Sequence, residues 1–204
     1  ENTIIIYCSD HGGVMPRSKR FMYNSGTHCP LIIRIPEKFK QLWPAEKPGS
    51  TVDRLVSFVD MPKTWLALTG AEIPETYQGR IFLGPDTEPE PDHHFAYRGR
   101  ADEALDMARA IRDKHHTYIK NYYPYIPSGQ HLAYQWRILA TQAWEKHFKE
   151  GKTNPVQSRY FLPRAPATFF DDTADWANIH NLIDQTQHQQ KVASLKQALR
   201  QQQT

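Results

Sequence analysis

Asp10 and His11 form an acid–imidazole pair one residue after an apolar run, Thr3 to Cys8, and directly before Gly12 and Gly13. A carboxylate and an imidazole can both bind a divalent cation, but a hard ion such as Ca²⁺ or Mg²⁺ would require further carboxylates. The neighbouring sequence offers no obvious ones. Taken alone, the pair therefore favours a structural role, in which Asp10 caps the turn and His11 ends the strand.

Lys19 follows within reach of the same turn, between Arg17 and Arg20. An ammonium suits sulfate or phosphoryl oxygens and can stabilise charge that grows on a leaving oxygen. The alternative is a solvated loop lysine, as most lysines are. Physical reasoning alone does not rank the three cations. His28, just before a second apolar run, could contact a substrate, although a loop histidine is more often incidental.

Other catalytic chemistries find little support. Ser9 and Ser18 lack a base of fixed orientation, so a serine nucleophile is not indicated, and no glycine-rich phosphate loop is present. Cys8 and Cys29 make no disulfide framework, and their apolar neighbours predict buried free thiols. A charged turn favours a surface cluster of ion pairs over substrate contact: Arg98, Arg100, Asp102 and Glu103.

The elements that position these residues begin with the run at 3–9, which predicts a strand buried on both faces, as in a parallel sheet between helices. Ligands bind beyond the carboxyl ends of such strands, where Asp10 and His11 stand. Leu31 to Ile35 predicts a second strand, and 36–50 predicts a surface loop. A short strand or turn at 54–59 leads to a helix that Asp60 caps and Gly70 ends.

The second half of the chain has a different pattern. Residues 71–92 are rich in proline and glycine and predict a linker. Beyond it, short strands are predicted at 94–97, 108–112, 117–122 and 169–170, the middle two joined as a hairpin at Asp113-Lys114. Helical spacing of apolar residues predicts a helix over 130–150 and a terminal helix over 186–203, with Val192, Leu195 and Leu199 on one face.

Composition narrows the class of partner. The chain has 204 residues and a formal net charge of +3 without a run of basic residues, which argues against nucleic acid. No stretch has the apolar length needed to span a bilayer. Because a central-type strand follows directly on Glu1, we expect the chain to be the C-terminal part of a longer protein. Strand 3–9 should then expose apolar surface and edges, through which copies could associate.

Six collinear motifs together resemble the C-terminal half of the sulfatase family, in the alkaline-phosphatase-like superfamily. They are Glu1-Asn2-Thr3-Ile4-Ile5-Ile6-Tyr7-Cys8-Ser9-Asp10-His11-Gly12; Lys19 with Tyr23-Asn24-Ser25-Gly26-Thr27-His28-Cys29-Pro30-Leu31-Ile32-Ile33; Val59-Asp60-Met61-Pro62-Lys63-Thr64 to Leu68-Thr69-Gly70; Gln78-Gly79-Arg80; Arg112-Asp113-Lys114 with Tyr118-Ile119-Lys120-Asn121-Tyr122; and Phe169-Phe170-Asp171-Asp172 with Asn181-Leu182. The family more usually has Glu-Gly-Gly at 24–26 and Arg at 28.

The resemblance implies roles for the site residues. Asp10 and His11 would be two ligands of a divalent cation, most often Ca²⁺, and Lys19 would act in catalysis by contacting the sulfate group and the leaving oxygen. Arg17 and His28 would bind substrate. Sulfatases use a formylglycine made within a Cys/Ser-x-Pro-Ser-Arg signature, which this chain lacks, as it lacks the early Asp-Asp pair of the metal site. Both would lie upstream, so we expect the chain to be inactive by itself.

The implied fold is α/β. Residues 1–84 would be the end of a mixed, mainly parallel sheet with flanking helices, and 85–204 a small α+β subdomain with an antiparallel sheet. The expected substrate is a sulfate ester or sulfamate on a small molecule or glycan, in the periplasm or outside the cell if the protein is typical of bacterial sulfatases. Two alternatives stay open: a phosphonate or phosphate-ester hydrolase of the same superfamily, and a non-catalytic binding module or pseudoenzyme.

Overall fold

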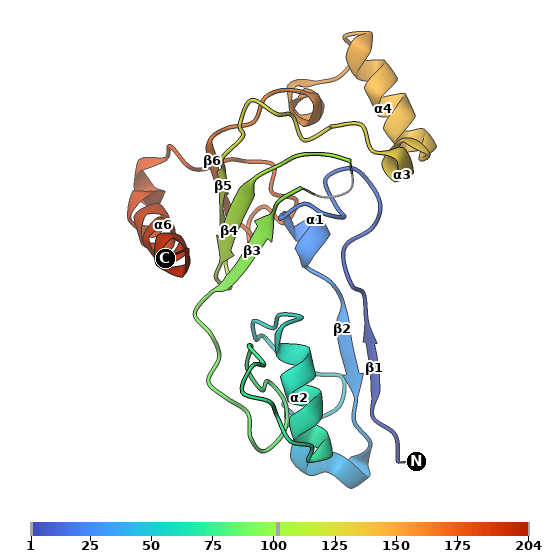
Figure 1. Ribbon diagram of the computed structural model, residues 1–204, viewed down its shortest axis with the longest axis vertical. Coiled ribbons are helices and arrows are strands. Elements are labelled where there is room, and N and C mark those ends of the chain that lie inside the picture. The colour runs from blue at the N-terminus through green and yellow to red at the C-terminus, as the bar shows by residue number, and fades with distance from the viewer. Residues whose placement is uncertain (1, 101–102, 204) are drawn as a thin grey trace. The chain divides into compact units, whose positions relative to one another are not determined.

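A computed structural model describes residues 2–100 and 103–203. The chain forms two compact units that interleave along the sequence. One unit comprises Glu1–Cys8 and Pro30–His94, and the other comprises Ser9–Cys29 and Phe95–Thr204. Each unit is coloured by residue number in Figure 1. The division of the whole protein into domains at 84/85 stays a prediction.

The first unit contains a two-stranded ribbon, the helix α2 (Asp60–Thr69) and a short 3-10 helix, η1 (Glu37–Leu42), within the predicted surface loop. The strands β1 (Ile5–Cys8) and β2 (Leu31–Arg34) pair antiparallel. Both strands were expected, but the predicted parallel arrangement is not confirmed. Residues 54–57 form neither helix nor strand.

Strand β1 differs from its prediction in burial. All four of its residues are exposed, and the side chain of Tyr7 is 64% accessible. The prediction of a strand buried on both faces is therefore wrong for this chain, because within the described residues β1 has a neighbour only in β2. Cys8 is exposed with it, so its assignment as a buried thiol is also wrong, and Cys29 is only half-buried.

Helix α2 begins and ends where its sequence predicts, and Gly70 adopts the left-handed conformation that closes it (φ 68°). Asp60 is the first helical residue rather than the cap, and its carboxylate accepts the backbone N–H groups of Ser57 and Arg80. Thr64, fully buried, donates to the Asp60 carbonyl and accepts from the Phe82 N–H. The helix thereby orders the long loop that follows it.

The second unit is built on a four-stranded sheet in the order β3 (His94–Arg98), β4 (Ala108–Arg112), β5 (His116–Asn121) and β6 (Ala167–Asp171). The predicted β4–β5 hairpin is confirmed, since Arg112 pairs with Thr117 and the Asp113 N–H donates to the His116 carbonyl. Strand β6 pairs antiparallel with β5. The antiparallel sheet expected of the small subdomain is present.

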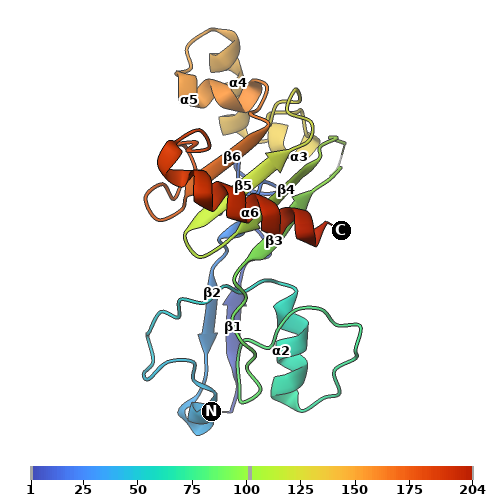
Figure 2. The ribbon, with the colours of Figure 1, turned by 90° about the vertical axis from the view of Figure 1, so that its left-hand side faces the viewer.

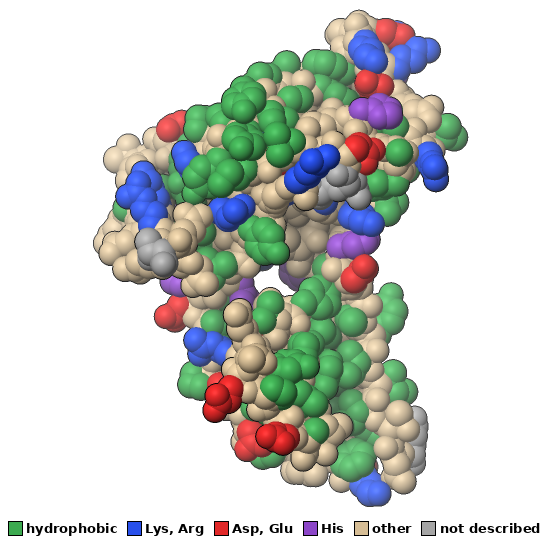
Figure 3. Space-filling model, viewed as in Figure 1, with side chains coloured by type: hydrophobic (Ala, Val, Ile, Leu, Met, Phe, Trp, Pro, Cys, Tyr) green, Lys and Arg blue, Asp and Glu red, His purple; other side chains and the backbone are tan. Residues whose placement is uncertain are grey.

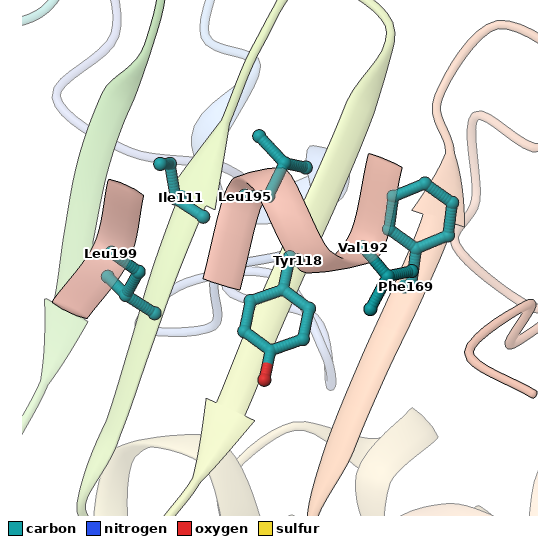
Figure 4. Packing of buried hydrophobic residues seen from close by; sticks show 6 residues of the cluster. All are labelled: Ile111, Tyr118, Phe169, Val192, Leu195 and Leu199. Carbon is teal, nitrogen blue, oxygen red and sulfur yellow. The ribbon is translucent and has the colours of Figure 1, made fainter. Parts of the chain in front are cut away.

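The terminal helix α6 (Gln189–Gln202) lies across one face of this sheet (Figure 2). Its preceding turn is a short 3-10 helix, η3 (Thr186–His188). As predicted, Val192, Leu195 and Leu199 are buried. They pack with apolar residues of three strands, as Figure 4 shows: Ile111, Tyr118 and Phe169. Side chains from one face of the helix thus pack on side chains from one face of the sheet, and together they form one core.

A second cluster covers another part of the sheet and includes Met22 from the segment 9–29. Met22 packs with Ala108, Ala110, Ile119 and Phe170. Tyr23 lies against the same cluster, edge-on to Phe170 at 6.0 Å between ring centroids. The segment that follows β1 is therefore anchored in the core of the second unit.

The predicted helix over 130–150 is two helices, α3 (Ala133–Trp136) and α4 (Leu139–Lys149). They are separated by Ile138, which is extended (φ −83°, ψ 120°). The side-chain amide of Gln142 donates to the Trp136 carbonyl at 2.7 Å, replacing the helical bond that the break removes. Apolar spacing alone continues through both helices, so the periodicity concealed the break.

Aromatic rings join α4 to the short elements that follow it, α5 (Pro155–Ser158) and η2 (Arg159–Phe161). Trp144 stacks on Tyr160 at 4.9 Å, and Phe148 stacks on Phe161 at 4.8 Å. On the face drawn in Figure 3, hydrophobic side chains are visible over both units. No helix of the described residues combines the length and apolarity that membrane crossing requires.

Candidate active site

The candidate site residues all lie on the segment 9–29, which folds back on itself through two glycines. The Gly12 N–H donates to the Gly26 carbonyl at 3.0 Å. A Cβ on Gly12 would lie 1.8 Å from the Ser25 carbonyl oxygen, and one on Gly26 would lie 2.2 Å from that of Phe21. Because backbone atoms would meet these Cβ atoms, only glycine permits the close approach of the two arms.

Asp10 and His11 face each other at the start of this segment. The Asp10 Oδ2 lies 3.5 Å from the His11 Nε2, and the Asp10 side chain is 85% exposed. The Nδ1 of His11 contacts the Gly12 carbonyl. In a neutral imidazole whose Nδ1 donates to a carbonyl, Nε2 carries the lone pair, and it is then the nitrogen that can bind a metal ion. The Ser9 hydroxyl donates to the His11 carbonyl at 2.6 Å, which further fixes the turn.

The pair is an incomplete donor set. Within the described residues, no three or more His, Cys, Asp or Glu side chains gather into a group that could hold a metal ion. Asp10 offers the oxygen that a hard cation prefers, and His11 offers a nitrogen, whereas Ca²⁺ takes six to eight ligands. The two side chains therefore fit one part of a cation site.

The backbone of Lys19 is held near the turn that carries this pair, because the Lys19 N–H donates to the Gly13 carbonyl at 2.9 Å. Arg17 and Arg20 on either side of it have positive φ angles of 65° and 69°. Such angles are uncommon for residues other than glycine, so the turn that presents Lys19 is tightly specified. Its ammonium lies over the ring of Tyr134, 5.2 Å from the centroid.

Arg17 contacts other residues of its own unit rather than an open surface. Its guanidinium donates to the carbonyls of Ala177 and Asn178, the latter at 2.9 Å, and lies 4.2 Å from the ring centroid of Tyr23. These contacts give Arg17 a clear role in ordering the segment. His28 follows the short helix α1 (Asn24–Thr27), and its side chain is exposed. Binding of substrate by either residue stays a prediction.

Asn24 is the centre of a buried polar network, with 1% of its surface exposed. Its Nδ2 donates to the Asp172 carboxylate at 3.1 Å and to the Trp176 carbonyl at 3.0 Å, and its Oδ1 accepts from the Arg112 guanidinium. The Asn24 N–H donates to the Asn178 Oδ1 at 2.8 Å. The network ties the segment 9–29 to β4 and to the chain after β6.

Asp172 is the only carboxylate of this network, and it is 8% exposed. It accepts hydrogen bonds from Thr117 at 2.6 Å and from Asn178 at 2.7 Å, and the Arg112 guanidinium lies 3.7 Å away. All of its main neighbours are donors, as a buried carboxylate requires. The sequence motifs at 24–26, 112 and 169–172 thus meet in one place.

A second buried charge cluster lies under the segment. The carboxylate of Asp106, wholly inaccessible, contacts Arg98 at 3.0 Å and Arg164 at 2.6 Å. Burial lowers the pKa of Arg98 to about 10, although Asp106 opposes the shift. The Arg98 guanidinium lies 4.4 Å from the ring centroid of Phe21. The expectation that Arg98 belongs to a surface cluster is therefore wrong; Asp102 of that turn lies outside the described residues.

The structure thus brings Asp10 and His11 together and holds the Lys19 backbone against Gly13, two residues beyond His11. Sequence reasoning missed Tyr134, because nothing in the pattern of a short helix relates it to residue 19. It also missed the hub at Asn24. A signal was present, since Asn24 is one of three positions, with Ser25 and His28, at which this motif departs from the residues more usual in the resembling family.

Comparison with known proteins identifies the family. The sulfatase family model matches residues 1–71. The chain is 37% identical over 205 residues to an ulvan-active sulfatase of Formosa agariphila, covering 98% of this chain and 32% of the relative. Over 83 residues it is 40% identical to an N-acetylglucosamine-6-O-sulfatase of Bacteroides thetaiotaomicron, covering 39% of this chain and 14% of that relative.

Solved structures show the same fold. BT4656, determined in complex with its substrate D-glucosamine-2-N,6-O-disulfate, superposes with a TM-score of 0.65 at 22% identity, covering 98% of this chain and 34% of that one. BT1596, a 2-O GAG sulfatase, superposes with a TM-score of 0.62 at 14% identity, covering 97% and 35%. The chain spans about a third of the length of the relatives that match nearly all of it. It belongs to the sulfatase family.

Proposed function

We propose that this chain is the C-terminal part of a sulfatase that hydrolyses a sulfate ester or sulfamate on a carbohydrate. The observation that carries the proposal is the 37% identity to an ulvan-active sulfatase along 98% of the chain, which includes the whole segment 9–29. The substrate class rests on two relatives, an N-acetylglucosamine-6-O-sulfatase and a protein whose structure contains a sulfated glucosamine as its substrate.

Asp10 and His11 are the residues that would hold a divalent cation, Ca²⁺ by the preference of the family. Their fit rests on the tautomer that the Gly12 carbonyl favours and on the convergence of the Asp10 Oδ2 and the His11 Nε2. The bound cation would supply positive charge to the oxygens of the sulfate group. Further carboxylate ligands would come from the longer protein.

Lys19 supplies the second positive charge. Its ammonium would contact the sulfate group and stabilise negative charge on the oxygen that leaves with the sugar. The 13–19 hydrogen bond keeps the backbone of Lys19 beside the turn of His11, so both charges would act on one group. Arg17 and His28 would bind other parts of the substrate. Arg17 would do so through the guanidinium N–H groups that do not donate to the carbonyls of Ala177 and Asn178.

The reactive nucleophile would be a formylglycine in the longer protein, since neither Cys8 nor Cys29 stands in a Cys-x-Pro-Ser-Arg sequence. The residues of this chain would bind and polarise the sulfate, but they would have no nucleophile to direct at it. We therefore expect the 204-residue chain to turn over no sulfate ester when it is purified alone.

The test is hydrolysis of 4-nitrophenyl sulfate and of sulfated oligosaccharides by the full-length protein and by this chain. Lys19→Ala should lower kcat/KM of the full-length enzyme by roughly 100- to 1,000-fold, the usual loss for one charge-stabilising donor. Lys152→Ala, at an exposed lysine, is the matched control. Hydrolysis of phosphate or phosphonate esters in place of sulfate esters would overturn the proposal, and turnover by this chain alone would refute its expected inactivity.

The cation is tested separately. Calcium content is measured by elemental analysis after dialysis of the full-length protein, with Asp10→Asn and His11→Ala as variants. Both variants should retain less calcium and lose activity, and neither should unfold, because both side chains lie at or near the surface. Unchanged calcium content in both would exclude the two residues as ligands and would favour a role in the turn alone.

A further inference from the structure

The ring of Tyr134 faces the ammonium of Lys19. The Lys19 Nζ lies 5.2 Å from the centroid of the Tyr134 ring, within the distance of a cation–π contact. Neither a hydrogen bond nor an ion pair is made by this ammonium to any described residue. The position of the positive charge thus depends on one aromatic ring.

The backbone of Lys19 is fixed, but its side chain is not. The bond to the Gly13 carbonyl and the left-handed conformations of Arg17 and Arg20 hold the main chain in place. Four side-chain rotatable bonds still separate this backbone from the charge, and a lysine of this kind samples many rotamers. A contact at the far end of the side chain is therefore what selects the direction of the ammonium.

The ring itself is firmly held. Tyr134 lies in α3 between Leu132 and Gln135, which are each 1% exposed. The Ala133 N–H donates to the Glu103 carboxylate at 2.6 Å, and Gln135 accepts from the Tyr160 hydroxyl at 3.2 Å. These neighbours fix the backbone on both sides of Tyr134, so its ring can serve as a rigid support for a flexible cation.

The hydroxyl of Tyr134 contributes nothing visible to this arrangement. It is buried and has no hydrogen-bond partner within the described residues. An unmade hydrogen bond at a buried hydroxyl is unfavourable, and phenylalanine at this position would avoid that cost. The aromatic face, rather than the hydroxyl, is therefore the part of Tyr134 that the contact with Lys19 uses.

We propose that Tyr134 is a positioning residue for Lys19: its ring holds the ammonium in the direction in which it stabilises the leaving oxygen. The ring occupies one side of the ammonium without accepting a conventional hydrogen bond, so the three N–H groups stay available to the substrate. This inference rests on the proposed role of Lys19. It assigns a function to α3, which lies outside the part of the chain that the sulfatase family model matches.

The experiment compares Tyr134→Phe and Tyr134→Leu in the full-length enzyme, with Tyr125→Leu, at an exposed tyrosine, as the matched control. The substrates are 4-nitrophenyl sulfate, which has a good leaving group, and phenyl sulfate, which has a poor one. Tyr134→Leu should lower kcat for phenyl sulfate by about tenfold with little change in KM, since a contact made mainly in the transition state is weakened. The loss for 4-nitrophenyl sulfate should be smaller.

Tyr134→Phe should retain the activity of the unaltered enzyme on both substrates. The ratio of the two substrates' rates does not depend on the fraction of enzyme that is folded, so partial unfolding of Tyr134→Leu would leave the readout intact. A loss that is equal for both substrates, or a loss in Tyr134→Phe as large as in Tyr134→Leu, would overturn the proposal.

A double-mutant cycle separates this inference from the proposed function. In a Lys19→Ala background, Tyr134→Leu should have no further effect, because the group it positions is gone. If Lys19→Ala itself is fully active, the proposed function fails. If Lys19→Ala loses activity while Tyr134→Leu keeps it, only the positioning role fails.

Discussion

The two units of this protein differ in whether they bury their apolar strands. In the first unit, β1 carries Ile5, Ile6 and Tyr7, and all three are exposed. In the second unit, Ile111 and Phe169 on β4 and β6 are wholly buried beneath α6. The residue types are alike, so composition does not set burial. What differs is that α6 packs on the four-stranded sheet of the second unit, whereas the ribbon of the first unit has two strands and contributes to neither of the buried apolar clusters found among the described residues.

Charges follow this division only in part, because the first unit also buries the carboxylate of Asp60. In the second unit, Asp106 is buried with Arg98 and Arg164, and Asp172 is buried among donors. In the first unit, the ion pair between Lys63 and Glu88 (2.8 Å) is partly exposed. The second unit thus buries charges by pairing them with opposite charges or with hydrogen-bond donors. The ribbon of the first unit has apolar residues of the kind found in a core, but these residues are exposed.

Removing Asp106 should produce the largest effect. Asp106→Ala would leave two buried guanidinium groups without their carboxylate, which should destabilise the second unit by about 3–5 kcal/mol. Glu88→Ala in the first unit breaks a partly exposed pair and should cost less than about 1 kcal/mol. Urea denaturation of both variants measures the difference. Equal losses would show that the two units do not differ in how they use charge.

Truncation of matched isoleucines tests the apolar half of the comparison. Ile111→Ala empties a site with 0% exposure and should cost about 2–5 kcal/mol. Ile6→Ala, at 38% exposure, should change stability by less than about 1 kcal/mol in this chain. Thermal denaturation checks both. A large loss for Ile6→Ala would mean that β1 is covered in solution, for example by a second copy, and light scattering would then detect the association.

Asn24→Ala should have an intermediate effect that is local to the site. It removes the contacts to Arg112, Asp172 and Trp176 and should cost roughly 1–3 kcal/mol, since buried partners are left unsatisfied. Amide hydrogen exchange should rise across 9–29 more than across β4 and β5. Thr27→Ala, at an exposed residue of the same helix, is the control. Uniform exchange along the chain would show that the network supports the whole unit rather than the segment.

The smallest expected effect concerns Asp113 in the β4–β5 turn. Burial alone would raise the pKa of its carboxyl, but hydrogen bonds from Lys191 and from the N–H groups of His115 and His116 outweigh burial and hold the pKa below the ordinary 3.8. A lowered carboxyl pKa stabilises the fold above the ordinary value, and this stabilisation is lost as pH falls through the lowered one.

Asp113→Asn should therefore lower the melting temperature at pH 7, by the equivalent of about 1 kcal/mol or less because Lys191 is partly exposed. The difference from the unaltered chain should shrink below pH 3.8. Thermal denaturation across pH 2–7 measures it. A difference that stays constant over this range would assign the effect to packing instead of charge.

Much of the fold could be predicted because local signals were strong. Gly70 and Asp60 marked α2, Asp113-Lys114 marked the hairpin, and the spacing of Val192, Leu195 and Leu199 marked the buried face of α6. The burial of β1 was predicted wrongly because a run of β-branched residues indicates a strand whose side chains favour burial. It does not indicate which neighbours are present to bury them. The break at Ile138 was hidden because the apolar period continues through it.

The site was predictable only in its residue types. Asp10, His11 and Lys19 stood out because few side chains suit cations and sulfate, and their neighbours matched a known order of motifs. The contacts that organise them were not predictable, since Tyr134 and Asn178 lie more than a hundred residues away and no local pattern records such pairings. Arg98 was misplaced for a related reason: its carboxylate partner Asp106 is near in sequence, but the covering ring of Phe21 and the second guanidinium on Asp106, that of Arg164, are remote.

The interleaving of the two units also bears on how the protein is made. Asn24 is bonded to Asn178, 154 positions later, and Arg17 to the same residue, 161 positions later. At a synthesis rate of about 5–20 residues per second, the ribosome needs roughly 10–30 s to deliver these partners. Until then the segment 9–29 lacks these hydrogen-bond partners. The turn that carries Lys19 is therefore completed only after the chain around Asn178 has been synthesised.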